Sequence, residues 1–271
     1  MTSNNVQTSY PANPGGAYAG QLADSGAIDI QSGIADADIV AGIICVRDNA
    51  GQGVAPPAAA AASATAILAT GGTSTGGTQT LTTALNGAVG RSAMVPPRNI
   101  TFTFSSHADW DATTATVTGL DADGEALSED FSIPNGGNAT VTGTKLFALV
   151  TSVSIPAQSG TGGTFTIGTG LLVGDMTRHV VGASLYDSTK APGPFSSGNT
   201  VPLARRGRIW LQSESGSPDD PVWVRVSASG AQVLGAVRGS SDGNTCTRLR
   251  GAVFRSTTSN GIAVVELNLP R

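Results

Sequence analysis

Short apolar runs, each closed by a cluster of turn residues, recur along this sequence and constrain its fold more than any other feature. In RNITFTF (residues 98–104), Ile100, Phe102 and Phe104 alternate with threonines, which is the period of a strand with one buried face. No segment keeps a helical apolar period over about ten residues with caps at its ends. A content of 36 glycines and only 13% charged residues agrees with a turn-rich β protein. The sequence therefore predicts an all-β fold.

The order of these runs predicts how the chain is divided. Residues 98–173 hold closely spaced strands with turns at Asp121 to Gly124 and at PNGG, a spacing typical of a small antiparallel sandwich. Residues 28–46 hold too few strands for a sheet of their own, so we expect them to complete the sheet of the C-terminal part. We therefore expect a small β-barrel or sandwich base from both chain ends (27–50 and 176–271). An antiparallel β-sandwich domain (98–173) would be inserted into it after a Gly/Ala/Thr-rich linker (51–97).

The N-terminal residues 1–26 predict an extended arm. Pro11, Pro14 and the neighbouring glycines disfavour a helix, and the apolar side chains are too sparse to recover about 1–2 kcal/mol of backbone entropy per ordered residue. An arm of this kind needs a surface that orders it. Tyr10, Tyr18 and Leu22 are the candidate anchors, and the unpaired backbone could add a strand to a neighbouring sheet.

Charge is distributed unevenly along the chain. The net charge is −4, but residues 1–177 carry a net of −9 and residues 178–271 a net of +5. An acidic total argues against bulk nucleic-acid binding. On strands, alternate residues share a face, so the arginines of LARRGRIWL and TRLRGAVFR predict a basic surface. That surface is either a solvated strand face or an interface with an acidic protein surface; its candidate residues are Arg205, Arg206, Arg208, Arg250 and Arg255.

No motif predicts a catalytic, cofactor or metal site, and we expect a protein that is not an enzyme. GTSTG (72–76) matches the nucleophile-elbow pattern but lies in the low-complexity segment, and SSHAD places neighbouring side chains on opposite strand faces. In DADGEALSED, Asp121, Asp123 and Asp130 fit three positions of a calcium loop whose first ligand is missing, so a turn and an ion site both remain open. Cys45 and Cys246 show no metal or redox spacing, which leaves free thiols or one bridge.

The N-terminus has no basic and apolar leader, and no apolar run approaches the length that spans a bilayer. We therefore expect synthesis as a soluble cytoplasmic chain and no membrane partner.

Several stretches resemble a known family. GGAYAGQLADSG, ADIVAGIICV and VVGASLYD…VPLARRGRIWLQ…GAVFRSTTSNGIAVVEL look like tailed-bacteriophage structural cement (head decoration) proteins, over roughly residues 9–48 and 176–269. The middle segment is similar to β modules of phage virion proteins. Because the family's usual form is compact, an insertion at 98–173 would depart from it.

The resemblance implies a structural virion protein on the outer surface of a phage capsid, made in the host cytoplasm. Its implied partners are the major capsid protein and itself, as a homotrimer, with arms that clamp neighbouring capsomers and stabilise the shell. The alternative is a head-fibre or tail component that binds a host receptor or glycan through residues 98–173, where Trp110 is the candidate for stacking on a sugar. A polysaccharide-degrading enzyme is the third, least favoured hypothesis, since no pair of acids stands out.

Overall fold

The computed structural model describes residues 17–24, 26–47, 53–59, 61–85, 94–105, 107–187 and 194–270. Their regular structure consists of strands and two single-turn 3-10 helices, η1 (Thr177–His179) and η2 (Gly243–Thr245). The all-β prediction is confirmed. No helix within these ranges is long and apolar enough to cross a membrane.

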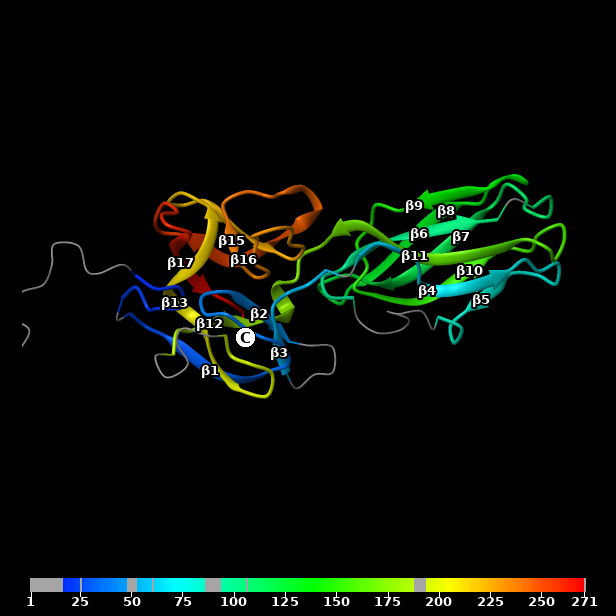
Figure 1. The fold of residues 1–271 in the computed structure, drawn as a ribbon. Helices are drawn as coiled ribbons and strands as arrows, with labels where there is room; N and C mark the ends of the chain where they lie inside the picture. Colours follow the sequence, from blue (N-terminus) through cyan, green and yellow to red (C-terminus); the bar gives the residue numbers. More distant parts are fainter. Residues whose placement is uncertain are drawn as a thin grey trace, which may run out of the picture.

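Nine strands from both ends of the sequence form one sheet system, which we call the base (Figure 1). They are β1 (Asp29–Ala35), β2 (Ile44–Arg47), β3 (Gly53–Ala55), β12 (Val180–Ser184), β13 (Thr200–Ser215), β14 (Pro221–Arg225), β15 (Val237–Arg238), β16 (Cys246–Phe254) and β17 (Ile262–Asn268). Their order is β1-β3-β2-β12-β13-β15-β14-β16-β17.

Strand β13 belongs to two closed rings of strands. Its first half pairs with β12 and, on the other side, with β1; its second half pairs with β15 and β17. The first ring encloses a core that includes Ile39, Cys45 and Phe195, and the second a core that includes Leu211 and Phe254. Closure removes exposed sheet edges, so the base is two small barrels joined by a common strand.

Eight further strands form two facing four-stranded sheets, which we call the sandwich (Figure 1). One sheet has the order β5 (Gln79–Leu81), β10 (Leu149–Ile155), β7 (Thr114–Leu120), β8 (Ala126–Ser132), and the other β4 (Ser63–Gly72), β11 (Thr164–Val173), β6 (Arg98–Phe104), β9 (Ala139–Thr142). Side chains of both sheets share one apolar core in which the rings of Phe102, Phe104 and Phe165 lie together.

The interpretation of residues 51–97 as a linker is wrong, because β3, β4 and β5 lie in that range. The contact between β4 and β11 needs small residues on both strands. A Cβ on Gly71 of β4 would meet the Phe165 ring at 2.2 Å, and one on Gly168 of β11 would meet the Ser63 carbonyl oxygen at 1.8 Å. The low-complexity composition of β4 therefore reflects close packing against β11 and not a connecting loop.

The base and the sandwich lie end to end and are joined by two crossings of the chain (Figure 1). Bonds between them accompany the crossings: the Thr247 hydroxyl donates to the Gly174 carbonyl oxygen, and the Arg178 guanidinium donates to the Asp123 carbonyl oxygen at the β7–β8 turn. Both cysteines are free and buried in the base, so the chain holds two thiols and no bridge between them.

Candidate interaction surface

Residues 17–24, which we call the arm root, run along β13 of their own chain. The Gly20 amide donates to the Trp210 carbonyl oxygen (2.6 Å), the Trp210 amide to Gln21 (2.9 Å) and the Ala23 amide to Arg208 (2.8 Å). Leu22 forms an antiparallel bridge with Ile209. The root thus occupies the edge of β13 between its pairings with β12 and β15.

This placement corrects part of the arm prediction. Residues around Tyr18 and Leu22 cannot add a strand to a neighbour's sheet while their backbone is paired with β13 of the same chain. Tyr10, with the rest of 1–16, lies outside the described residues. Tyr18 and Leu22 are therefore part of the arm's attachment.

The root fits closely because two glycines face each other. Gly20 (φ +84°) and Gly42 (φ +77°) adopt the left-handed backbone conformation that glycine tolerates best. A Cβ on Gly42 would meet the Gly20 amide nitrogen at 2.6 Å. The two chain segments can approach at this distance only without side chains.

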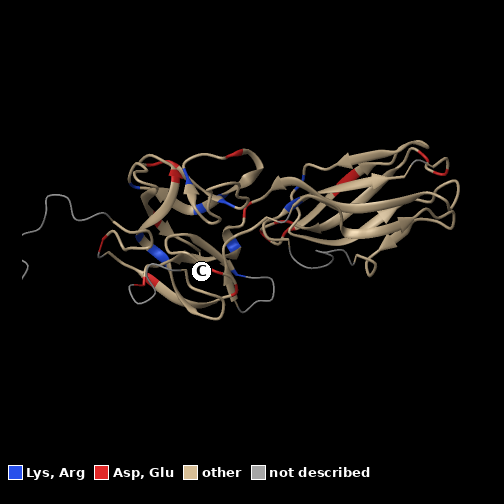
Figure 2. Cartoon of the chain, viewed as in Figure 1, with Lys and Arg blue, Asp and Glu red and all other residues tan. Residues whose placement is uncertain are grey.

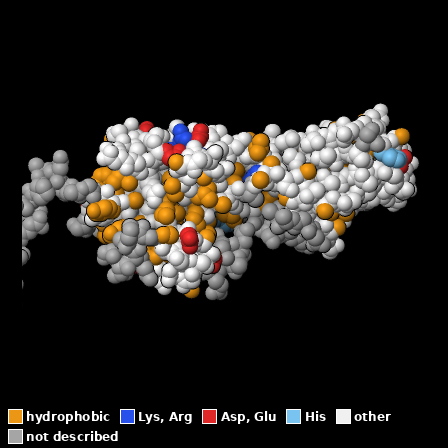
Figure 3. All heavy atoms as spheres, viewed as in Figure 1, with side chains coloured by type: hydrophobic (Ala, Val, Ile, Leu, Met, Phe, Trp, Pro, Cys, Tyr) orange, Lys and Arg blue, Asp and Glu red, His pale blue; other side chains and the backbone are white. Residues whose placement is uncertain are grey.

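Apolar side chains are exposed on the base near the root. Tyr18 (62% exposed) stacks on Tyr186 at a ring-centroid distance of 5.5 Å, and Leu22 is also exposed. Ile30 and Ile34 are exposed elsewhere on the base, on β1. Figure 3 shows hydrophobic side chains gathered over the base, whereas the visible face of the sandwich carries few. Apolar groups of this size concentrated on one part of a surface favour an interaction site.

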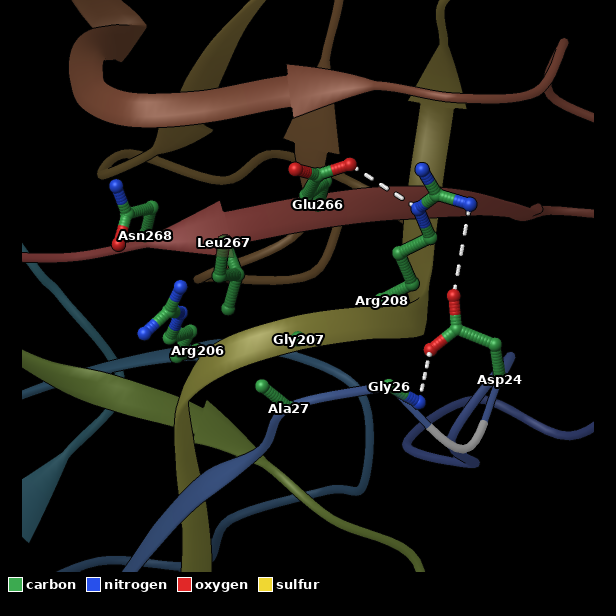
Figure 4. Close-up of a pocket in the computed structure, with 9 residues that line it drawn as sticks. All are labelled: Asp24, Gly26, Ala27, Arg206, Gly207, Arg208, Glu266, Leu267 and Asn268. Carbon is green, nitrogen blue, oxygen red and sulfur yellow. Dashed lines mark hydrogen bonds and ion pairs between the residues drawn. The ribbon is translucent and has the colours of Figure 1, made fainter.

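The arginines next to the root are paired with carboxylates (Figure 4). Arg208 contacts Glu266 through Nε (3.0 Å) and Asp24 of the root through Nη1 (3.5 Å). Arg255 contacts the same Glu266 oxygen (2.9 Å) and Asp219 (2.9 Å). Hydrogen bonds from Arg255 and Arg208 lower the pKa of Glu266. The expected basic surface is therefore wrong at Arg208 and Arg255, whose charge is neutralised by acids distant in sequence.

The remaining predicted arginines divide into three environments. Arg250 pairs with Asp175, and Arg205 donates to the Pro270 carbonyl oxygen. Arg206 is exposed and lines the hollow of about 350 Å³ shown in Figure 4, where no partner within the described ranges binds its guanidinium. Of the predicted interface arginines, Arg206 best fits a group open to an acidic partner.

Sequence reasoning missed a buried ionic cluster. Arg225 is fully buried; its guanidinium binds Glu214 at both oxygens and Asp242 (2.8 Å), and Arg238 also contacts Asp242 (2.9 Å). The hydrogen bonds that Arg225 donates to Glu214 and Asp242 raise the pKa of Arg225. The only signal was one arginine inside the apolar run PVWVRV. The cluster fixes β13, β14 and the η2 segment together.

The sandwich does not carry the sites that the sequence left open. Trp110 is fully buried against Phe104 and Phe165, and every phenylalanine and tryptophan of the described sandwich is buried, so the proposed sugar-stacking residue is wrong. His107 lies 3.4 Å from Asp109, and Ser106 is outside the described residues.

The acidic turn of the sandwich is explained by hydrogen bonds. Asp121 Oδ1 accepts from the amides of Asp123 (2.8 Å) and Glu125 (2.9 Å), and Asp130 accepts from the Thr116 hydroxyl (2.7 Å). Gly124 provides the left-handed residue of the β7–β8 hairpin. Within the described ranges, no three His, Cys, Asp or Glu side chains are grouped as metal ligands.

Comparison with known proteins gives one family match. The model of the family described as structural cement protein (E217 gp24/Pam3 gp6) matches residues 111–268, more than half of the chain. The match runs from β7 of the sandwich through β17 of the base, so residues 111–173 lie within the family model, contrary to the expectation that the inserted part departs from it. No curated protein matches the chain.

Proposed function

The chain belongs to the structural cement protein family of phages, and from this membership we propose that it clamps neighbouring capsomers on the outer surface of a capsid and stabilises the shell. Membership makes it a structural phage protein associated with the capsid. The clamping role, the arm as the clamp and a homotrimeric state are the parts that we propose.

The observation that carries the proposal is the attachment of the arm root to β13. A segment that reaches from one subunit to another holds them together only if its near end is fixed to its own protein. Four backbone hydrogen bonds fix the root, counting the one that the Tyr186 amide donates to Gly20 (2.9 Å). Residues 1–16, which precede the root, could span up to about 55 Å when fully extended. We propose that this reach extends to a neighbouring subunit.

The exposed apolar groups around the root support the same assignment. Tyr18, Tyr186 and Leu22 are exposed apolar side chains at or next to the root, which begins at residue 17. Aromatic side chains contribute large contact areas at protein interfaces. We therefore place the capsid contact on this part of the base, with Arg206 beside it as a group for an acidic partner.

Repetition would strengthen a weak contact. If three copies associate, three arms bind with the avidity of linked sites, because each later arm binds at a high effective concentration. Sedimentation equilibrium of the purified protein tests the trimer directly: a monomer at all concentrations removes this part of the proposal.

The clamp is tested with bare, expanded capsids. Full-length protein and a variant that lacks residues 1–16 are added to the shells, and binding and the capsid's thermal transition are measured by co-sedimentation and calorimetry. The deletion ends at residue 16 because removal of residues 17–24 would also unpair β13. We expect the full chain to bind and to raise the transition, and the truncated chain to raise it less or not at all.

Two results contradict the proposal in different ways. Failure of the full chain to bind expanded shells removes the capsid-clamping role. Equal stabilisation by both proteins keeps the cement role but refutes the arm as the clamp. A host-binding role of the sandwich predicts that residues 98–173 mediate adsorption to cells.

A further inference from the structure

A cavity in the base, separate from the arm root, gathers positive charge. Its volume is about 390 Å³, and it lies at the side of the first barrel where β2, η1, β12 and β13 meet the chain near Pro270. Three arginines line it from three different elements: Arg47 at the end of β2, Arg178 in η1 and Arg205 in β13. His179 lines it as well. Figure 2 shows that most lysine and arginine positions coloured in the described chain lie on the base.

The described lining contains no carboxylate. Its other members are apolar or neutral: Gln31, Val180, Val181 and Pro270. Three guanidinium groups around one cavity repel one another, and the repulsion is stronger where protein excludes water. This environment contrasts with Arg208 and Arg255, which share acids of their own chain.

One donor in this cluster has no partner. Arg205 Nε is buried from solvent and donates to no acceptor in the described structure, although Nη2 of the same group donates to the Pro270 carbonyl oxygen. A buried donor without an acceptor costs about 1–3 kcal/mol. Because Nε itself is closed to solvent, a ligand in the cavity would bind the outer nitrogens of the Arg205 guanidinium rather than Nε.

We propose that this cavity is an oxyanion-binding site, which receives the carboxylate of an acidic side chain or a phosphate group between Arg47, Arg178 and Arg205. Both ligands present oxygens in the plane and spacing that guanidinium groups recognise with paired hydrogen bonds. The site does not depend on the arm or on the capsid-clamping role.

His179 provides a reporter for the site. Burial, and then the charge of Arg178, lower the pKa of His179, so the imidazole is held neutral beside the arginines. An anion in the cavity would change the field at this ring. The chain has only two histidines, and the other, His107, lies in the sandwich next to Asp109. It serves as an internal control.

The test uses the full-length protein and NMR of the two histidine rings. Sodium phosphate and sodium glutarate are titrated separately at constant pH and ionic strength, with sodium chloride as the reference salt. We expect a saturable shift of the His179 resonance and none of the His107 resonance. Binding of phosphate alone assigns a phosphate ligand, binding of glutarate alone assigns a carboxylate, and binding of both assigns a site that accepts either oxyanion.

Variants locate the site. Arg205→Gln removes the group with the unpartnered donor, and Arg47→Gln removes a second guanidinium while leaving the Pro270 contact intact. Each should weaken the affinity about tenfold or more, since hydrogen bonds to charged groups are the strong ones. Arg206→Gln is the matched control: it is the next residue of β13, but it lines the other hollow. It should keep the wild-type affinity.

The proposal is overturned if His179 does not respond to either anion more than to chloride. It is also overturned if Arg47→Gln and Arg206→Gln lose the same affinity, because nonspecific attraction to the basic base would then explain the binding. An unchanged His107 resonance in each variant shows that the sandwich is still folded, and far-UV circular dichroism checks the base.

Discussion

The attachment of the arm root can be tested at Gly20, where a methyl group would meet only backbone. A Cβ at this position would lie 2.6 Å from the Tyr186 amide nitrogen, 2.9 Å from the Leu185 carbonyl carbon and 3.0 Å from the Gly42 amide nitrogen. No flexible side chain can move aside to accept it. Gly20→Ala should therefore open the contact between the root and the base.

The magnitude follows from two contributions. The left-handed conformation at φ +84° costs a residue with a Cβ about 1–2 kcal/mol. Overpacking of a methyl group against these backbone atoms adds about 1–3 kcal/mol to the closed state. Because both costs are relieved on opening, their sum of about 2–5 kcal/mol raises the open population by roughly 30-fold to a few thousandfold, since about 1.4 kcal/mol is tenfold.

Hydrogen exchange at single amides reads this opening. The amides of Trp210 and Tyr186 donate to the root, so both should exchange about 30-fold faster or more in Gly20→Ala, unless global unfolding already limits them. Amides in the β13–β17 pairing around Ile209 and Val265 should keep their protection because that pairing does not include the root.

Gly198→Ala is the matched control for strain. Gly198 has φ +85°, but a Cβ there would meet no atom within 4 Å. The Gly198→Ala variant should lose stability because alanine disfavours a positive φ, but the Trp210 amide should exchange no faster than in the wild type. The reasoning is refuted if Trp210 and Tyr186 stay as protected in Gly20→Ala as in the wild type.

Three further changes probe the base. Arg225→Met leaves two carboxylates without their buried partner and should lower the free energy of unfolding by about 3–5 kcal/mol in urea denaturation; an unchanged midpoint would show that the cluster is neutral for stability. Two arginines lower the pKa of Glu266 in the folded protein. The Glu266 carboxylate therefore stabilises the fold above about pH 4.3, and this stabilisation is lost as the pH falls through the lowered pKa of the folded state. Glu266→Gln should therefore flatten the fall of melting temperature on the acid side, and an identical pH profile would contradict this. Burial raises the pKa of Cys45 to about 12, so iodoacetamide at pH 8 should label it only in denaturant; rapid labelling of the native protein would place it at the surface.

Local patterns predicted strands well where one face is buried. The alternation in residues 98–104 corresponds to β6, whose Ile100, Phe102 and Phe104 are fully buried. The turn at Asp121 to Gly124 joins β7 and β8 in register from Leu120 opposite Ala126. Periodicity and turn chemistry are local properties, so the sequence contains them directly.

Tertiary pairing decided the features that were missed. The composition of β4 resembles a linker, but its strand is stabilised by pairing with β11, nearly a hundred residues away. The predicted basic surface is interrupted for the same reason: Asp24 and Glu266 neutralise Arg208 from distant positions in the sequence. A strand period shows which side chains share a face but not which charges face them.

The shared strand explains why the arm root and the oxyanion cavity are placed so close to both barrels. Gly207 lies where β13 changes its partner from β1 to β17. Its φ of +125° is a backbone conformation that residues with a side chain rarely adopt. On one side of this point Arg205 reaches the cavity; on the other, Arg208 and Trp210 hold the root. A force applied through the root would therefore act on a strand that both barrels hold along most of its length.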